Sequence, residues 1–210
     1  MYIPALFKNE DLSAVKDFIA ANGFATLVSH VNGRPWATHI PLMLDTNAEG
    51  KEVLTGHISK ANNQWKAFND HDELLVIFTG PHAYVSSSWY DHENAPTWNY
   101  TAVHVYGRIS MIAGDLLKSR LGKLLNKYEA GMKHPVSIET MSPGFVEKEM
   151  RGIVGFDIEI TEIQAASKLS QNRDAKNYDA IINELLAKGD KDSLAMAGLM
   201  KEEQLKNKHR

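Results

Sequence analysis

Four polar residues near the end of one predicted strand have the chemistry to hold a phosphate. Thr55, His57, Ser59 and Lys60 place two hydroxyls, an imidazole and an ammonium within six positions. Hydrogen bonds from such groups to a phosphate are strengthened by charge. The run therefore predicts an anion-binding site in which Lys60 supplies the full positive charge.

The same run has a second interpretation. Ser59, Lys60 and Asn62 could form the capping turn of a short helix predicted at 62–68, while Thr55 and His57 occupy outward positions on the strand. The two interpretations are compatible, because a helix N-terminus itself attracts phosphate.

An aromatic segment follows that could cover a flat ring. It includes Trp89, Tyr90, Trp98 and Tyr100. Aromatic side chains of this kind more often fill a core or a subunit interface, so both interpretations stay open.

A hairpin is the clearest signal among the elements that must position these residues. Asn32-Gly33 favours the positive φ angles of a tight turn and lies between predicted strands at 25–31 and 35–44. Further predicted strands are 52–57, 73–79, 83–87, 99–113 and 153–163, and the predicted helices are 10–21, 62–68, 116–128, 175–188 and one after residue 193. Short strands with peripheral helices predict a mainly β fold (α+β) built on an antiparallel barrel, and argue against a doubly wound sheet.

The strand predicted at 99–113 has two different faces. One row is apolar, with Val103, Val105, Ile109 and Met111, and the other is aromatic and polar, with Tyr100, His104, Tyr106 and Arg108. Because strand side chains alternate, one face should pack on the core and the other on a ligand or a second subunit.

Composition limits the class of protein. A chain of 210 residues with 43% hydrophobic residues can bury a full core, and the absence of cysteine excludes disulfides and thiolate metal sites. A formal net charge of -3 gives no general attraction to DNA. The first residues lack a secretion-signal pattern and no run is long and apolar enough to span a bilayer, so a cytoplasmic protein is expected.

Common catalytic motifs are missing. The sequence has no P-loop, dinucleotide-binding glycine pattern, nucleophile elbow or paired zinc histidines. The nine histidines are scattered, so no metal site is predicted. His104 is interpreted as a hydrogen-bonded interface residue, with ligation of haem as the alternative.

The last part of the chain is predicted to form a helical hairpin. Eight basic residues face seven acidic ones from residue 169 onward, so this part is nearly neutral. Two helices around a Gly turn could be a DNA-binding helix-turn-helix, but packing on the barrel or on a partner subunit is the favoured interpretation.

Several ordered motifs match one known family over nearly the whole chain. They are Met1-Tyr2-Ile3-Pro4 with Phe7, Ala37-Thr38-His39-Ile40-Pro41-Leu42, Gly56-His57-Ile58-Ser59-Lys60-Ala61-Asn62, residues 78–84, Ser88-Trp89-Tyr90, Pro96-Thr97-Trp98-Asn99-Tyr100 and Lys168-Leu169-Ser170-Gln171-Asn172-Arg173. With these motifs the chain resembles the PaiB family, described as FMN-binding negative transcriptional regulators with the split β-barrel of the pyridoxamine-phosphate-oxidase superfamily.

The resemblance implies a homodimer with flavin sites at the subunit interface. It implies a split antiparallel barrel of the FMN-binding type at residues 1–167 and a C-terminal helical extension at 168–210, packed on the barrel or on the partner subunit. The residues that it assigns to the phosphate and ribityl chain are Thr38, His39, Thr55, Ser59 and Lys60, with His57 beside them.

A second group of residues is expected at the flavin ring. The resemblance implies that Trp98 and Asn99 of the opposite subunit approach the isoalloxazine edge and that Lys168, Gln171 and Arg173 close the pocket. One departure is clear, because Thr38-His39 stand where true pyridoxamine-phosphate oxidases carry an arginine. Their substrate reaction is therefore not expected here.

Three functions remain open at this point. The first is an FMN-binding repressor that contacts DNA or another protein. The second is a flavin-dependent oxidoreductase whose substrate stacks beside Trp98. The third is a haem-binding or haem-degrading protein with His104 or His209 as the iron ligand.

Overall fold

The hairpin around Asn32-Gly33 begins the sheet, as predicted. Strands β1 (Phe24–Val31) and β2 (Arg34–Thr46) pair antiparallel, with Val31 opposite Arg34. Asn32 and Gly33 have φ angles of 52° and 74°, which these two residue types accept at little steric cost.

The computed structural model describes residues 1–69 and 72–208, the last two of these by their backbone alone. The chain folds as two compact units. Unit 1 contains Met1–Val15, Thr79–Val103 and Gln164–Arg210, and unit 2 contains Lys16–Phe78 and His104–Ile163.

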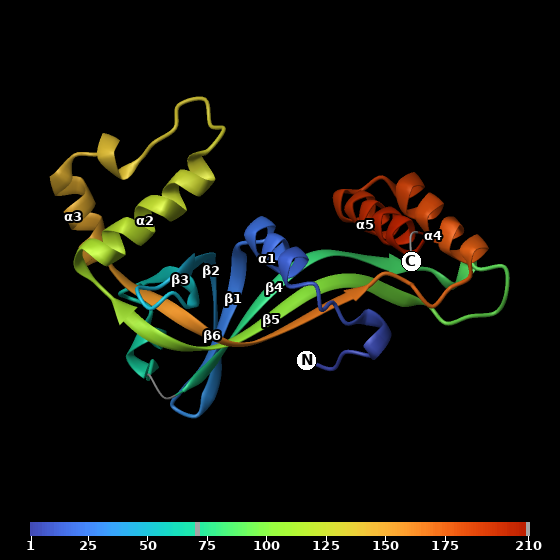
Figure 1. The fold of residues 1–210 in the computed structure, drawn as a ribbon, viewed down its shortest axis with the longest axis horizontal. Coiled ribbons are helices and arrows are strands. Elements are labelled where there is room, and N and C mark those ends of the chain that lie inside the picture. The colour runs from blue at the N-terminus through green and yellow to red at the C-terminus, as the bar shows by residue number, and fades with distance from the viewer. Residues whose placement is uncertain (70–71, 209–210) are drawn as a thin grey trace. The chain divides into compact units, whose positions relative to one another are not determined.

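Six strands and five α-helices lie in the part of the chain that the structure describes (Figure 1). The later strands are β3 (Glu52–Ser59), β4 (Glu73–Val85), β5 (Thr97–Ile112) and β6 (Ile153–Lys168). Neighbours are hydrogen-bonded in the order β1-β2-β3-β6-β5-β4, and β1 also pairs with β4, so the order closes on itself. A mainly antiparallel sheet is therefore confirmed, and a doubly wound sheet is not formed.

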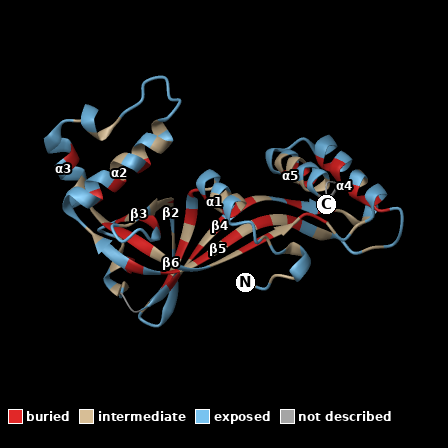
Figure 2. Ribbon diagram, in the orientation of Figure 1, coloured by how far each residue is buried: buried red, intermediate tan, exposed pale blue. Residues whose placement is uncertain are grey.

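The core of unit 2 is one face of this sheet. Side chains of alternate residues point to it from the strands, and the fully buried ones include Leu27, Leu42, Leu54, Phe78, Ile109, Phe156 and Ile158. Each such residue contributes roughly 1.5–3 kcal/mol by leaving water. Figure 2 shows the resulting alternation of buried and more exposed residues along β5. The predicted apolar row is buried at Val103, Val105 and Ile109, whereas Met111 near the end of the strand is 46% exposed.

Helix α2 (Gly114–Glu129) covers the opposite face of β3 and β6. A Cβ at Gly155 on β6 would collide with the Leu117 side chain in its present position, so glycine at this position allows the helix to approach the strand closely. Helix α1 (Leu12–Ala21) was also predicted, whereas α3 (Pro143–Arg151) was not. Proline is favoured in the first turn of a helix, which explains why Ser142-Pro143 starts one here.

Two predicted strand boundaries were wrong. The segments at 73–79 and 83–87 form a single strand, because Gly80-Pro81 does not interrupt β4. The ladder of β4 with β1 is confined to Leu75–Ile77, so Pro81 lies where no β1 partner needs its missing N–H group. Strand β6 runs to Lys168, five residues beyond the predicted end.

Unit 1 contains helices α4 (Ala175–Lys188) and α5 (Lys191–Lys208), joined by Gly189 in the left-handed conformation. A buried cluster links them to β4 and to the end of β6; its members include Ala83, Val85, Leu169, Tyr178, Ile181, Leu185, Met196 and Met200. The Tyr178 hydroxyl donates to the Met200 carbonyl at 2.9 Å. Short 3₁₀ helices lie at η1 (Ala5–Phe7), η2 (Asn63–Ala67), η3 (Ser87–Trp89) and η4 (Ile138–Thr140).

Candidate functional site

A tight turn after β3 presents Lys60. The Asn62 N–H donates to the Ser59 carbonyl at 2.9 Å, which makes residues 59–62 a β-turn with Lys60 at its second position. The backbone of Lys60 is held on both sides, because its N–H donates to the Gly152 carbonyl at 2.8 Å and its carbonyl accepts from Trp65 Nε1 at 3.0 Å. The Lys60 ammonium is exposed and has no partner among the described residues, so its charge is available to a ligand.

Four of the predicted site residues share one face of the sheet. The register places Met43 opposite Thr55, and alternation along each strand puts His39 on the same side as Thr55, His57 and Ser59. This is the face opposite the core of unit 2. The predicted anion-binding residues of β2 and β3, apart from Thr38, therefore converge on a single surface.

Besides Oδ1 of Asp157, the cross-strand partner of Thr55, two buried polar atoms on that surface have no hydrogen-bond partner in the described part of the chain. They are Thr55 Oγ1, on a side chain that is 1% exposed, and His57 Nδ1. Burial lowers the pKa of His57, so its imidazole is neutral at pH 7. Buried polar groups are nearly always paired, and these two atoms are therefore suited to receive a ligand.

His39 lies at the exposed side of this surface. Its Nδ1 is 3.0 Å from Thr26 Oγ1, and its ring stacks on Phe24 with centroids 6.2 Å apart. Phe24 is 68% exposed, which is unusual for a large aromatic side chain on a regular strand.

Thr38 points to the other side of β2. Its hydroxyl donates to Gln64 Oε1 and accepts from Asn62 Nδ2, the latter at 2.9 Å. Thr38 and His39 are consecutive on one strand, so they cannot line the same surface. The structure thus brings His39, but not Thr38, together with the residues of β3.

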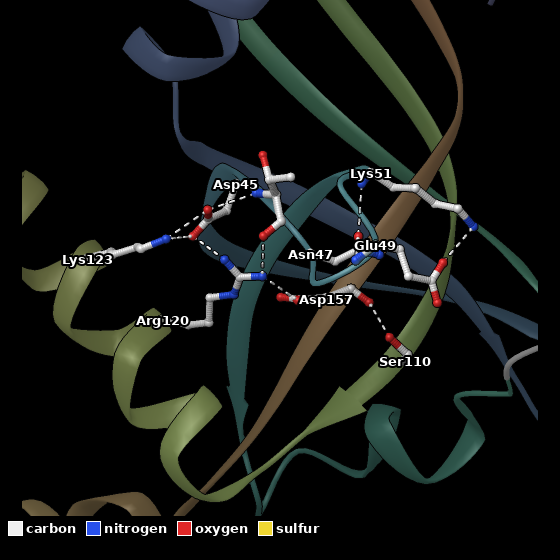
Figure 3. Close-up of polar contacts among 9 residues, drawn as sticks. Asp45, Asn47, Glu49, Lys51, Ser110, Arg120, Lys123 and Asp157 are labelled. Carbon is white, nitrogen blue, oxygen red and sulfur yellow. Dashed lines mark hydrogen bonds and ion pairs between the residues drawn. The ribbon is translucent and has the colours of Figure 1, made fainter.

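An ionic network borders the same surface beneath α2 (Figure 3). Arg120 pairs with Asp45 and with Asp157, the latter at 3.0 Å, and also donates to the Thr46 carbonyl. Asp157 is the cross-strand partner of Thr55. The network fixes α2 next to Thr55, and nothing in the sequence pattern had indicated it, because its members lie 75 and 37 residues from Arg120.

Trp98 belongs to an exposed aromatic cluster in unit 1. Its ring centroid is 6.1 Å from that of His82 and 5.8 Å from that of Tyr84, and the Trp98 side chain is 53% exposed. His82 and Tyr84 were not predicted as site residues. The i, i+2 spacing of two aromatic rings on a strand could have indicated them.

Asn99 has no free polar group. It is fully buried, its Oδ1 accepts from the Ser170 hydroxyl at 2.9 Å, and its Nδ2 lies 3.5 Å from Met200 Sδ. Ser170 has a φ of 61°, a conformation that is uncommon for a residue with a side chain. The structure therefore places Asn99 as a support for the turn at 168–173.

The other residues of that turn also have partners within unit 1. Lys168 donates to the Thr97 hydroxyl and lies 6.0 Å from the centroid of the Phe7 ring. Gln171 folds back onto its own turn, where Oε1 accepts from the Leu169 N–H at 2.7 Å. Arg173 stacks over the Tyr90 ring at 5.0 Å.

Other possible sites are less developed. A polar groove of about 420 Å³ lies between α2 and η4 and contains none of the predicted residues. Over the described ranges, we found no cluster of three or more His, Asp or Glu side chains arranged for a metal ion. Within the same ranges, no helix has both the length and the apolar character needed to cross a bilayer.

Comparison with known proteins gives matches along most of the chain. Residues 1–162 match the family model described as "Putative FMN-binding domain". The Bacillus subtilis (strain 168) "Protease synthase and sporulation protein PAI 2" is 44% identical over 202 residues, which cover 96% of this chain and 97% of that protein.

Solved structures share the fold at low sequence identity. The FAD and haem binding protein from Mycobacterium smegmatis superposes with a TM-score of 0.62 at 17% identity, covering 87% of this chain and 80% of that one. The flavocytochrome Anf3 from Azotobacter vinelandii gives a TM-score of 0.58 at 19% identity, covering 82% and 75%.

Proposed function

Since this chain belongs to the FMN-binding domain family, as its resemblance to PaiB predicted, we propose that it is a homodimeric FMN-binding repressor with a split-barrel fold. FMN is the cofactor of this family. One observation carries the proposal for the site: the turn at 59–62 offers an unpaired ammonium beside a surface with unpaired, buried polar atoms.

The residues of this surface fit the chemistry of FMN. A phosphate monoester carries roughly -1.5 to -2 charges at neutral pH, and Lys60 provides a full positive charge for it. Thr55, His57 and Ser59 provide hydrogen-bonding groups for phosphate or ribityl oxygens. Bound FMN would supply electron or hydride transfer, while these residues hold its polar end.

A second copy of the chain fits the outer face of β1 and β2. Phe24, which shares this face with His39, is 68% exposed, and a large apolar side chain at such a position is typical of a subunit interface. In the homodimer that we propose, Trp98 of the partner approaches the flavin ring. His82 and Tyr84 flank that tryptophan.

The proposed regulatory role rests on the similarity to the Bacillus subtilis protein and on the resemblance to the PaiB family. The Bacillus subtilis protein carries the name "Protease synthase and sporulation protein PAI 2". The PaiB family, which this chain resembles, is described as negative transcriptional regulators. A repressor that contacts DNA would bind it with a strong dependence on salt. In this proposal helices α4 and α5 form the C-terminal hairpin that packs on the barrel.

Replacement of Lys60 tests the site directly. Lys60→Ala removes one charge-assisted contact, worth about 1.5–3 kcal/mol, so FMN binding should weaken about tenfold to a hundredfold. Riboflavin has no phosphate, and its affinity should hardly change. Fluorescence titrations of both flavins provide the measurement, with Lys66→Ala on nearby η2 as the matched control. Equal FMN affinity of Lys60→Ala and the unchanged protein would refute this site.

Haem is a second candidate ligand, favoured by one observation. His104 Nδ1 is buried and has no partner in the described part of the chain, and burial lowers the pKa of this histidine. A neutral imidazole is the form that ligates iron. His209, the other predicted ligand, lies outside the described residues. A Soret band on haem addition that is lost in His104→Ala would support this candidate.

A further inference from the structure

Thr38 on β2 and two residues at the start of η2, Asn62 and Gln64, form a closed ring of hydrogen bonds. The Thr38 hydroxyl donates to Gln64 Oε1, the Gln64 backbone N–H donates to Asn62 Oδ1 at 3.0 Å, and Asn62 Nδ2 donates to the Thr38 hydroxyl at 2.9 Å. Each member is both donor and acceptor. A ring of this kind fixes the rotamers of all three side chains.

Gln64 ties this ring to the sheet. Its side chain is completely buried, and Nε2 donates to Ser29 Oγ at 2.9 Å and reaches the Leu27 and Trp36 carbonyls at 3.4 Å. A buried primary amide is costly unless it is paired, and here its oxygen and nitrogen both have partners. Helix η2 is therefore locked onto β1 and β2 through one residue.

The same helix holds the turn that carries Lys60. Asn62 is the last residue of that turn, and Trp65 on η2 donates its indole N–H to the Lys60 carbonyl at 3.0 Å. The Lys60 backbone is thus fixed from the side of η2 at two points. The side chain of Lys60, in contrast, is exposed and free of partners in the described part of the chain.

We infer that Gln64, with Thr38 and Asn62, is a positioning element that sets the place of the Lys60 ammonium and thereby the preference for a phosphorylated flavin over an unphosphorylated one. This inference rests on the proposed function. Thr38 acts through Asn62 and Gln64, and it does not touch the ligand. Loss of these hydrogen bonds should weaken the binding of the phosphate group and leave the binding of the isoalloxazine nearly unchanged.

Thr38→Val is the sharpest test, because it keeps the shape of the side chain and removes both of its hydrogen bonds. We expect FMN to bind about tenfold more weakly and riboflavin within about twofold of the unchanged protein. Thr38→Ser retains the hydroxyl and should restore FMN binding. Thr46→Val makes the same chemical change at an exposed position of the same strand and serves as the control.

Trp65→Phe provides a second variant if Thr38→Val does not fold. It removes the hydrogen bond from the indole N–H to the Lys60 carbonyl and leaves the hydrogen bonds among Thr38, Asn62 and Gln64 intact. The affinity for FMN should therefore again fall more than the affinity for riboflavin. A parallel loss of both flavins, or no loss of either, would overturn the inference.

Lys60→Ala separates this inference from the proposed function. If Lys60→Ala abolishes the preference for FMN and Thr38→Val retains it, only the positioning role is wrong. If Lys60→Ala retains the preference, the proposed site itself is wrong.

Discussion

Arg120 should be the most sensitive ionic residue of unit 2. Its side chain is 7% exposed and it pairs with two carboxylates, Asp157 at 7% and Asp45 at 13% exposure (Figure 3). In Arg120→Met, Asp45 would keep Lys123 at 2.7 Å, whereas the Asp157 carboxylate would keep no cation. Leaving a buried charge unpaired costs about 3–5 kcal/mol, and we expect the free energy of unfolding to fall by that amount.

Lys123→Met is the matched control for this measurement. It removes the other cation of Asp45 from the same helix, but the Lys123 side chain is 53% exposed, so the loss should be below about 1 kcal/mol. Urea denaturation followed by circular dichroism measures both variants. The double variant Arg120→Met with Asp157→Leu should recover most of the lost stability, because no carboxylate is then left unpaired.

The pH dependence of the same variants gives an independent check. Burial acts to raise the pKa of Asp45, but hydrogen bonds from Lys123, the Thr46 backbone and Arg120 outweigh it, so this pKa lies below its ordinary value of 3.8. Its stabilisation is present above that value and is lost as pH falls through the folded pKa. In Arg120→Met, the pKa of Asp45 should move back toward its ordinary value, so the deficit relative to the wild-type protein grows as pH rises through this range. Equal, small and pH-independent losses in Arg120→Met and Lys123→Met would refute the reasoning.

Two further predictions concern unit 1. Hydrogen bonds from Lys176, His92 and Asn177 lower the pKa of Asp91, so the stabilisation from this carboxylate is present above pH 3.8 and is lost as pH falls. Asp91→Asn should therefore reduce the loss of stability at acid pH. An unchanged acid part of the stability profile would contradict this assignment. Trp98→Ala should raise the fluorescence of bound FMN and reduce its affinity less than Lys60→Ala does, since Trp98 faces the ring in our proposal and not the phosphate; unchanged emission in a titration would place Trp98 away from the flavin.

Local patterns in the sequence predicted the elements well where one strong signal decided them. Asn32-Gly33 defined the first hairpin, and the apolar spacing before Gly189 gave α4 its observed bounds. Helix α3 and the continuity of β4 were missed for a common reason. Pro143 and Pro81 suggest interruption when read alone, yet one starts a helix and the other lies where its missing N–H is not needed.

The candidate site was predictable in its residue types and less so in its geometry. The polar run on β3 indicated Thr55, His57, Ser59 and Lys60, but the separation of Thr38 from them follows from alternation combined with the register of β2. Gln64 had no sequence signal at all. Its importance comes from complete burial and from partners 26 to 37 residues away along the chain.

The most direct test of the central claim is an absorption spectrum of the purified protein after FMN is added and free ligand is removed by gel filtration. Flavin bands near one per subunit should elute with a dimer, and they should be lost in Lys60→Ala and retained in Lys66→Ala. A protein that retains no flavin, or one that shows a Soret band with haem instead, would contradict the central claim.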